Sequence, residues 1–253
     1  MLIRAVIFDL GNTLMYPIAP DLWPEVIKRG NRALMDYLCN LNILIDTECD
    51  DFMLEFNQRL HQYYDDRDEQ MIETSTFLVL KELLAEKGYS DISDSVIRES
   101  LDAHYAVTQK NWQLEDDTFA CLITLREQNY KLGLVSNAGD HRDVLQLVAK
   151  FELDPYFEFI LTSAGCGYRK PHQKIFQLAQ EKANAKAEEI VMVGDTLKAD
   201  ILGANRIGMY SIWITRRTDF PPDDTLPVQP RAIIKTLGEL PSLLRELELD
   251  LRS

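Results

Sequence analysis

The chain has 253 residues, of which 46% are hydrophobic and 27% are charged, and its formal net charge is −14. This composition is ordinary for a globular protein and excludes a disordered, repetitive or low-complexity chain. The acidic balance argues against general nucleic-acid binding, which usually needs a basic face. We therefore expect one large domain, or a medium-sized domain carrying a smaller one, without a nucleic-acid partner.

Two features of the sequence bear on where the protein works. No apolar run approaches the ~20 residues that span a bilayer, and Asp9 interrupts the apolar N-terminal segment before a signal-peptide core could form. The four cysteines lie far apart without a CxxC pair, which is typical of reduced thiols. We expect a cytoplasmic protein without a membrane partner. Its oligomeric state stays open, with a homodimer among the alternatives.

The N-terminal half of the chain changes character after one strand. Residues 3–8 form a short β-rich run that ends in a turn at Asp9. Helices are then expected, from apolar residues three and four apart, at 23–41, 49–64, 74–86 and 94–111. Asp21 and Ser93 are the expected helix start signals. The acidic stretch 63–69 is expected to be a solvated loop.

From about residue 117 the pattern alternates between helix and strand. Helices are expected at 117–128, 140–151, 172–182, 197–206 and 236–248, and strands at 131–135, 157–161, 190–193, 210–214 and 232–234. The strands are apolar throughout, which is typical of a parallel sheet covered on both faces. The predicted fold class is α/β, a three-layer Rossmann-like core with a mostly parallel sheet. The core would comprise residues 1–16 and 115–253, and residues 17–114 would form an inserted helical domain.

Folds of this class place their sites at the carboxyl ends of the strands. Asp9, Ser136 and Asp195 each follow or end a predicted strand, and Lys170 lies just beyond another. A single Asp or Ser at such a place is usually an ordinary turn residue. The four residues together, in this order, predict one shared site.

The combination resembles the haloacid dehalogenase superfamily of hydrolases. Four of its motifs are present: VIFDLGNTL at 6–14, GLVSNA at 133–138, YRKPHQKIF at 168–176 and VMVGDTLKAD at 191–200. The resemblance covers the first fifteen residues and nearly everything after residue 117. It implies that the helical insert is a cap of the first type, a lid that excludes water and supplies substrate contacts.

The resemblance also implies a magnesium-dependent phosphatase that acts on a small phosphorylated metabolite through an aspartyl-phosphate. Asp9 would be the nucleophile. Mg²⁺ prefers oxygen ligands, and Asp9, Asp195 and the backbone carbonyl of Gly11 would bind it. Asp200 would support the metal, and Thr13 would orient the nucleophile through its hydroxyl.

Three further residues would handle the phosphoryl group. Lys170 would offset its charge as a catalytic and substrate-binding residue, while Ser136 and Asn137 would bind its oxygens. Pro171 suits the first turn of the next helix, and His172 is expected to start that helix. The tryptophans are expected to be packing residues: Trp23, Trp112 and Trp213.

The first motif departs from the family pattern. Family phosphatases typically carry a second Asp two residues after the nucleophile, as general acid and then base, but this chain has Gly11 there. General acid–base help is typically worth ~10²–10⁴-fold in rate. One reading is a phosphatase in which another group supplies the proton, and His61 or His104 in the insert could do so.

Two other readings stay open. A 2-haloacid dehalogenase or a phosphonatase-type hydrolase also lacks the second Asp. Asp195 and Asp200 disfavour the dehalogenase, because carbon–halogen displacement needs no magnesium and the family's dehalogenases replace this Gly-Asp pair. A phosphonatase would need a cap lysine, and the insert offers Lys28, Lys81 and Lys87. The last reading is a non-catalytic protein that binds a phosphate ligand.

Overall fold

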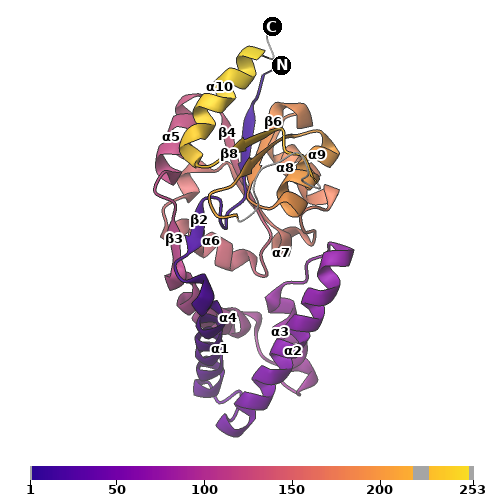
Figure 1. The fold of residues 1–253 in the computed structure, drawn as a ribbon. Helices are drawn as coiled ribbons and strands as arrows, with labels where there is room; N and C mark the ends of the chain where they lie inside the picture. The colour runs from indigo at the N-terminus through magenta and orange to yellow at the C-terminus, as the bar shows by residue number, and fades with distance from the viewer. Residues whose placement is uncertain (1, 219–227, 251–253) are drawn as a thin grey trace.

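The computed structural model describes residues 2–218 and 228–250 (Figure 1). Its centre is a six-stranded sheet of order β5-β4-β1-β6-β7-β8, in which every neighbouring pair is parallel. The strands are β1 (Ala5–Phe8), β4 (Lys131–Ser136), β5 (Phe159–Thr162), β6 (Ile190–Gly194), β7 (Tyr210–Ile214) and β8 (Ala232–Ile234). All six were expected from the sequence, with small shifts at their ends, and the predicted α/β class is confirmed.

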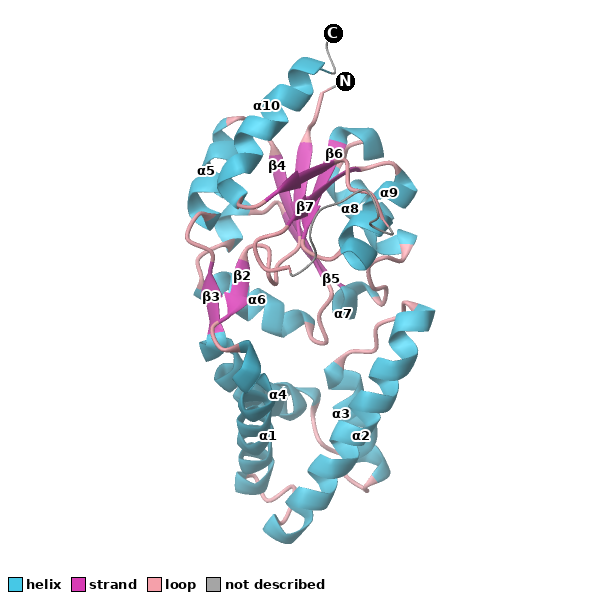
Figure 2. Ribbon diagram, viewed as in Figure 1, coloured by secondary structure: helices cyan, strands magenta, loops and turns pink. Residues whose placement is uncertain are grey.

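Helices cover both faces of this sheet, as Figure 2 shows. In β1, Val6 and Phe8 point into one apolar cluster and Ala5 and Ile7 into another, as the two-residue period of a strand requires. One face is covered by α5 (Thr118–Glu127), α6 (His141–Lys150) and α10 (Leu240–Asp250). The other face is covered by α8 (Gln173–Ala183) and α9 (Leu202–Ile207). The core therefore has the three predicted layers.

Four helices form a separate block beyond the carboxyl ends of the strands, at the opposite end of the molecule from both termini (Figure 1). They are α1 (Trp23–Asn40), α2 (Asp46–Gln70), α3 (Thr76–Glu86) and α4 (Asp94–Thr108). The block has its own apolar core, which includes Leu34, Phe56, Leu80 and Leu101. None of the helices in the described part of the chain could serve as a transmembrane span.

Local signals placed most of these helix boundaries. Ser93 caps α4 by accepting a hydrogen bond from the Val96 amide, as expected. The expectation for Asp21 was wrong, because α1 follows a 3-10 turn (Pro20–Leu22) and has no side-chain cap. The expectation of a loop at 63–69 was also wrong: α2 continues through it, since this stretch contains neither glycine nor proline to end a helix.

A small antiparallel ribbon was not expected from the sequence. It pairs β2 (Met15–Pro17) with β3 (Trp112–Leu114), the segments through which the chain enters and leaves the helical block. Strands of three residues are too short for a periodic pattern to reveal. The helix expected at 197–206 is divided into a π-helical turn (Leu197–Ile201) and α9.

Candidate active site

The sheet order brings the predicted site residues together. Because β1 lies between β4 and β6, the residues at the carboxyl ends of these three strands share one edge. Asp9 follows β1 and its amide donates to the carbonyl of Val193 on β6, at 2.9 Å. Ser136 ends β4, and Asp195 follows β6. All three line one cavity of about 360 Å³, here called the strand-end cavity, together with Lys170 and Trp112.

Lys170 contacts residues from three different segments of the site. Its Nζ lies 2.6 Å from Oδ1 of Asp9 and 2.6 Å from Oδ1 of Asp200, and it donates to the carbonyl of Val135 at 2.9 Å. Only 2% of its side chain is exposed. Burial by itself favours the neutral amine, but the carboxylates of Asp200 and Asp9 outweigh it and raise the pKa of Lys170. The side chain is therefore a fixed cation beside the predicted nucleophile.

Three carboxyl groups crowd around this single cation. Oxygens of Asp9, Asp195 and Asp200 lie within 4.8 Å of one another. Burial raises the pKa of Asp9, assisted by repulsion from Asp200 and Asp195 and opposed by Lys170. Burial and the charge of Asp200 raise the pKa of Asp195 to about 6. One ammonium against three carboxylates leaves an excess of negative charge, and an oxygen-ligated divalent cation would compensate it.

Close packing at the end of β6 requires Gly194. A Cβ at this position would lie 2.3 Å from Cγ of Asp200, so no side chain fits there. Asp200 in turn accepts the amide of Thr196 at 3.0 Å. Trp213, which is fully buried as expected of a packing residue, donates its indole N–H to the carbonyl of Asp195 at 2.7 Å. The Gly-Asp pair of the fourth motif is thus held against Asp200.

Asn137 makes a contact that sequence reasoning missed. Its side-chain amide donates to the carbonyl of Lys170 at 3.0 Å, and its Oδ1 accepts the Lys170 amide at 2.8 Å. This two-way pairing joins the turn after β4 to the loop that carries the cation. Asn137 therefore positions the Lys170 backbone, which its place in the second motif did not reveal.

Three other predicted residues lie close by. Thr13 is fully buried, and among the described residues its hydroxyl has no hydrogen-bond partner. His172 caps α8, as expected, by accepting the amide of Lys174 on Nδ1. Pro171 was expected in the first turn of α8 but precedes this cap, after a cis Lys170–Pro171 peptide bond.

The helical block closes directly onto the Lys170 loop. The amide of Glu73 donates to the carbonyl of Gly167, and the amide of Arg169 donates to the carbonyl of Met71, both at 2.9 Å. The buried carboxylate of Glu73 accepts the Ser163 hydroxyl at 2.6 Å and pairs with the guanidinium of Arg169. A buried ion pair thus joins the segment between α2 and α3 to the residue next to Lys170.

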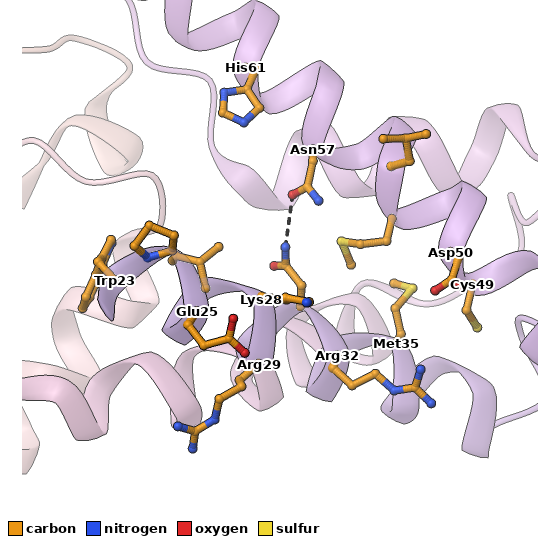
Figure 3. A pocket seen from close by; sticks show the side chains of 15 residues that line it. Trp23, Glu25, Lys28, Arg29, Arg32, Met35, Cys49, Asp50, Asn57 and His61 are labelled. Atoms are coloured by element: carbon orange, nitrogen blue, oxygen red, sulfur yellow. Dashed lines mark hydrogen bonds between the residues drawn. The ribbon is translucent and has the colours of Figure 1, made fainter. Parts of the chain in front are cut away.

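Two further hollows lie on the side of the helical block. The junction cavity, about 370 Å³, has walls from both parts of the molecule: Trp23, Phe56 and Leu101 from the block, and Gly139 and Asp143 from the core. A larger groove of about 760 Å³ lies between α1 and α2. Figure 3 shows His61 and Asn57 of α2 facing Lys28 of α1 across it, with Asn57 bonded to Asn31 at 3.1 Å. His61 and Lys28, the alternative candidates from the insert, line this groove, whereas the residues of the strand-end cavity such as Asp9, Lys170 and Asp195 do not.

Comparison with known proteins agrees with this geometry. The family model of the haloacid dehalogenase-like hydrolases matches residues 3–208. The chain belongs to this family, and it is an enzyme of the hydrolase class.

Particular relatives differ in how much they share with the chain. A glyceraldehyde 3-phosphate phosphatase of Pyrococcus abyssi is 40% identical over 92 residues, which cover 36% of this chain and only 38% of that protein. A protein of the same name from Methanopyrus kandleri is 27% identical over 247 residues, 94% of this chain and 99% of the relative. The crystal structure of a 2-haloacid dehalogenase from Pseudomonas syringae pv. tomato DC3000 superposes with a TM-score of 0.70 at 26% identity, covering 97% of this chain and all of that one.

Proposed function

We propose that the protein is a magnesium-dependent phosphoric monoester hydrolase that cleaves a small phosphorylated metabolite through a phosphoryl group carried on Asp9. One observation carries the proposal: buried Lys170 pairs with both Asp9 and Asp200 inside an otherwise acidic cluster. A nucleophilic carboxylate must approach a phosphate dianion, so fixed cations have to offset the repulsion between them. The names of the Pyrococcus and Methanopyrus relatives support the same reaction class.

The donor set fits magnesium. Asp9, Asp195 and the backbone carbonyl of Gly11 offer only oxygen ligands, which Mg²⁺ prefers over nitrogen or sulfur. Asp200 would support these ligands without binding the ion, since it already pairs with Lys170 and accepts the Thr196 amide. When bound, the ion would supply charge compensation for the phosphoryl oxygens.

The chain's own groups would carry out the transfer. Asp9 would attack phosphorus with the oxygen that Lys170 does not hold, and Lys170 would keep the carboxylate turned toward the substrate. Ser136 lines the same cavity and would donate its hydroxyl to a phosphoryl oxygen. Asn137 would serve this arrangement by fixing the Lys170 backbone.

In this proposal residues 17–114 act as a cap over a core formed by residues 1–16 and 115–253. The β2–β3 ribbon would be the hinge, because both chain crossings run through it. The Glu73–Arg169 pair would hold the cap shut against the Lys170 loop. Closure would exclude water from the site while the ester is bound.

A 2-haloacid dehalogenase is the second candidate, supported by the Pseudomonas structure and by the absence of a side chain at Gly11. The acidic cluster favours the phosphatase. Displacing a halide from carbon calls for no cation, whereas three crowded carboxyl groups with one lysine are strongly unfavourable without one.

The deciding experiment compares wild type with Asp9→Asn. Wild type should release phosphate from a panel of metabolite esters with Mg²⁺ and stop with EDTA, while Asp9→Asn should lose release by at least ~10³-fold with an unchanged circular dichroism spectrum. Halide release from 2-haloacids in EDTA, without phosphate release, would establish the dehalogenase instead. Substantial turnover by Asp9→Asn would remove the nucleophile assignment.

A further inference from the structure

One carboxyl group in the strand-end cavity stands apart from the acidic cluster. The cavity is lined by four aspartates, and three of them, Asp9, Asp195 and Asp200, form the acidic cluster. The fourth is Asp143, in the first turn of α6. No sequence motif drew attention to it. It is the remaining carboxyl in a cavity where Gly11 provides no acid beside the nucleophile.

The partners of Asp143 differ from those of the neighbouring acids. Its Oδ1 accepts a hydrogen bond from Nε2 of Gln109 at 2.8 Å. Within the described residues no cation pairs with it, whereas Asp140 has Arg98 at 2.7 Å and Asp102 has Arg142 at 2.8 Å. A neutral amide holds one carboxyl oxygen without fixing the group as an anion. In the part of the chain that the structure describes, no hydrogen bond to its Oδ2 is found, and the residue lines the cavity.

Gln109 is itself held in place. Its Nε2 also donates to Oε1 of Gln146 at 3.1 Å, and its carbonyl accepts the ammonium of Lys150 at 2.5 Å. Asp140 caps α6 by accepting the amides of Arg142 and Asp143. Asp143 is therefore anchored on a capped helix with one oxygen oriented, which suits a group that must meet a substrate atom.

Asp143 also exchanges its proton near neutrality. Burial raises its pKa to about 7, the Gln109 hydrogen bond opposes this, and the charges of Asp140 and Asp102 add to it. Several other ionisable groups surround it. The cations nearby are Arg98, Arg142 and Lys150. The junction cavity adds His61, His104 and Tyr105, and the strand-end cavity adds Asp9, Asp195, Asp200 and Lys170. A carboxyl with this pKa is suited to give and take a proton at the working pH of most enzymes.

The position of Asp143 matches the path of an ester. Asp143 and Gly139 line both the strand-end cavity and the junction cavity. With the phosphoryl group at Asp9, the organic part of the ester would extend into the junction cavity. The ester oxygen, which joins the phosphoryl group to the organic part, would then lie at the wall that the two cavities share, beside Asp143.

We propose that Asp143 donates the proton to the leaving oxygen and later takes a proton from the attacking water. This inference rests on the proposed phosphatase function. In the first step Asp9 forms a bond to phosphorus, the phosphorus–oxygen bond of the ester breaks, and protonated Asp143 gives its proton to that oxygen, releasing an alcohol. In the second step water attacks the phosphorus, the bond to Asp9 breaks, and the Asp143 carboxylate accepts the water's proton. Inorganic phosphate leaves and both aspartates return to their starting states.

The test compares two esters that differ in their need for a proton. β-Glycerol phosphate releases an alkoxide that must be protonated, while p-nitrophenyl phosphate releases a stable anion. Asp143→Asn should lower kcat/KM for the glycerol ester by ~10²–10⁴-fold and for the nitrophenyl ester by less than ~10-fold. In wild type the rate on the glycerol ester should fall above about pH 7, and this fall should be absent for the nitrophenyl ester.

Asp154→Asn is the matched control. Asp154 is an exposed aspartate that lines neither cavity and does not act on the pKa of Asp143, so the ratio of the two rates should stay as in wild type. Equal losses on both esters in Asp143→Asn, or an unchanged rate on the glycerol ester, would overturn the proposal. If Asp143→Asn does not fold, matching wild-type pH profiles for the two esters overturn it. Wild type that releases no phosphate from any ester overturns the proposed function and this inference together.

Discussion

The indole ring of Trp112 lies against Gly11. A Cβ at Gly11 would lie 3.5 Å from Cη2 and 3.8 Å from Cζ3 of that ring, which are ordinary van der Waals contacts. Trp112 is backed in turn by Trp23, whose ring meets it edge-on with centroids 5.6 Å apart. Trp112 was expected only to pack, yet it forms a wall of the strand-end cavity. The site is therefore apolar where family phosphatases typically carry their acid.

This contact predicts different outcomes for two substitutions at Gly11. Gly11→Ala should be tolerated, because the added methyl group has room and Gly11 does not adopt a positive φ. Gly11→Asp should lower the free energy of unfolding by about 1–3 kcal/mol, since its carboxylate would extend along the apolar ring. Urea denaturation and phosphate release measure both effects. A faster alkyl-phosphate hydrolysis by Gly11→Asp would contradict the prediction.

Magnesium should stabilise the protein through the acidic cluster. An ion that binds only the folded state at one hundred times its Kd adds about 2.7 kcal/mol of stability. The Tm of wild type should therefore rise with Mg²⁺, and Asp195→Asn should reduce that rise. Asp154 is exposed and does not belong to the cluster. The Tm of Asp154→Asn should therefore rise with Mg²⁺ as much as that of wild type. A thermal shift that is equal in all three proteins would place the ion elsewhere.

The buried pair between Glu73 and Arg169 should contribute much more than an exposed one. The Glu73 side chain is fully buried and accepts from both Arg169 and Ser163. Removing one partner of such a pair leaves a buried charge, so Glu73→Gln should cost about 3 kcal/mol. Glu86→Gln is the comparison. Glu86 pairs with Arg59 but is 60% exposed, and because solvent screens such a pair, its loss should change stability little. Similar unfolding midpoints for the two variants would contradict a large contribution of the Glu73–Arg169 pair to stability.

His104 should make the stability depend on pH. Burial lowers its pKa from 6.5 to about 4, against the weaker effect of a hydrogen bond that the ring donates to the backbone of Gly30. As the pH falls below 6.5 the unfolded chain takes up a proton before the folded one, so stability is lost between about pH 6.5 and 4. The full loss is on the order of 3 kcal/mol. The unfolding free energy of wild type minus that of His104→Leu should therefore become smaller as the pH is lowered through this window. A difference that does not depend on pH would exclude the effect.

Features that depend on neighbouring residues could be predicted from the amino-acid pattern alone. Apolar residues three and four apart identified α1 to α4, and buried apolar runs identified the six strands, because both periods are set within a few residues. The strand ends then selected Asp9, Ser136 and Asp195, and the parallel topology predicted that they would share one edge. The three-residue strands β2 and β3 are too short to show a period, so they were not predicted.

The contacts between side chains far apart in the sequence became known only from the folded structure. The contact of Lys170 with Asp9 spans 161 positions, and that of Asn137 with the Lys170 backbone spans 33. Asp143 and Trp112 lie on ordinary helical and extended segments, and no local pattern marks them as cavity residues. Their roles follow from the order of the strands and from the position of the helical block at the carboxyl ends of the strands. Both are fixed by packing between distant segments, which local periodicity does not encode.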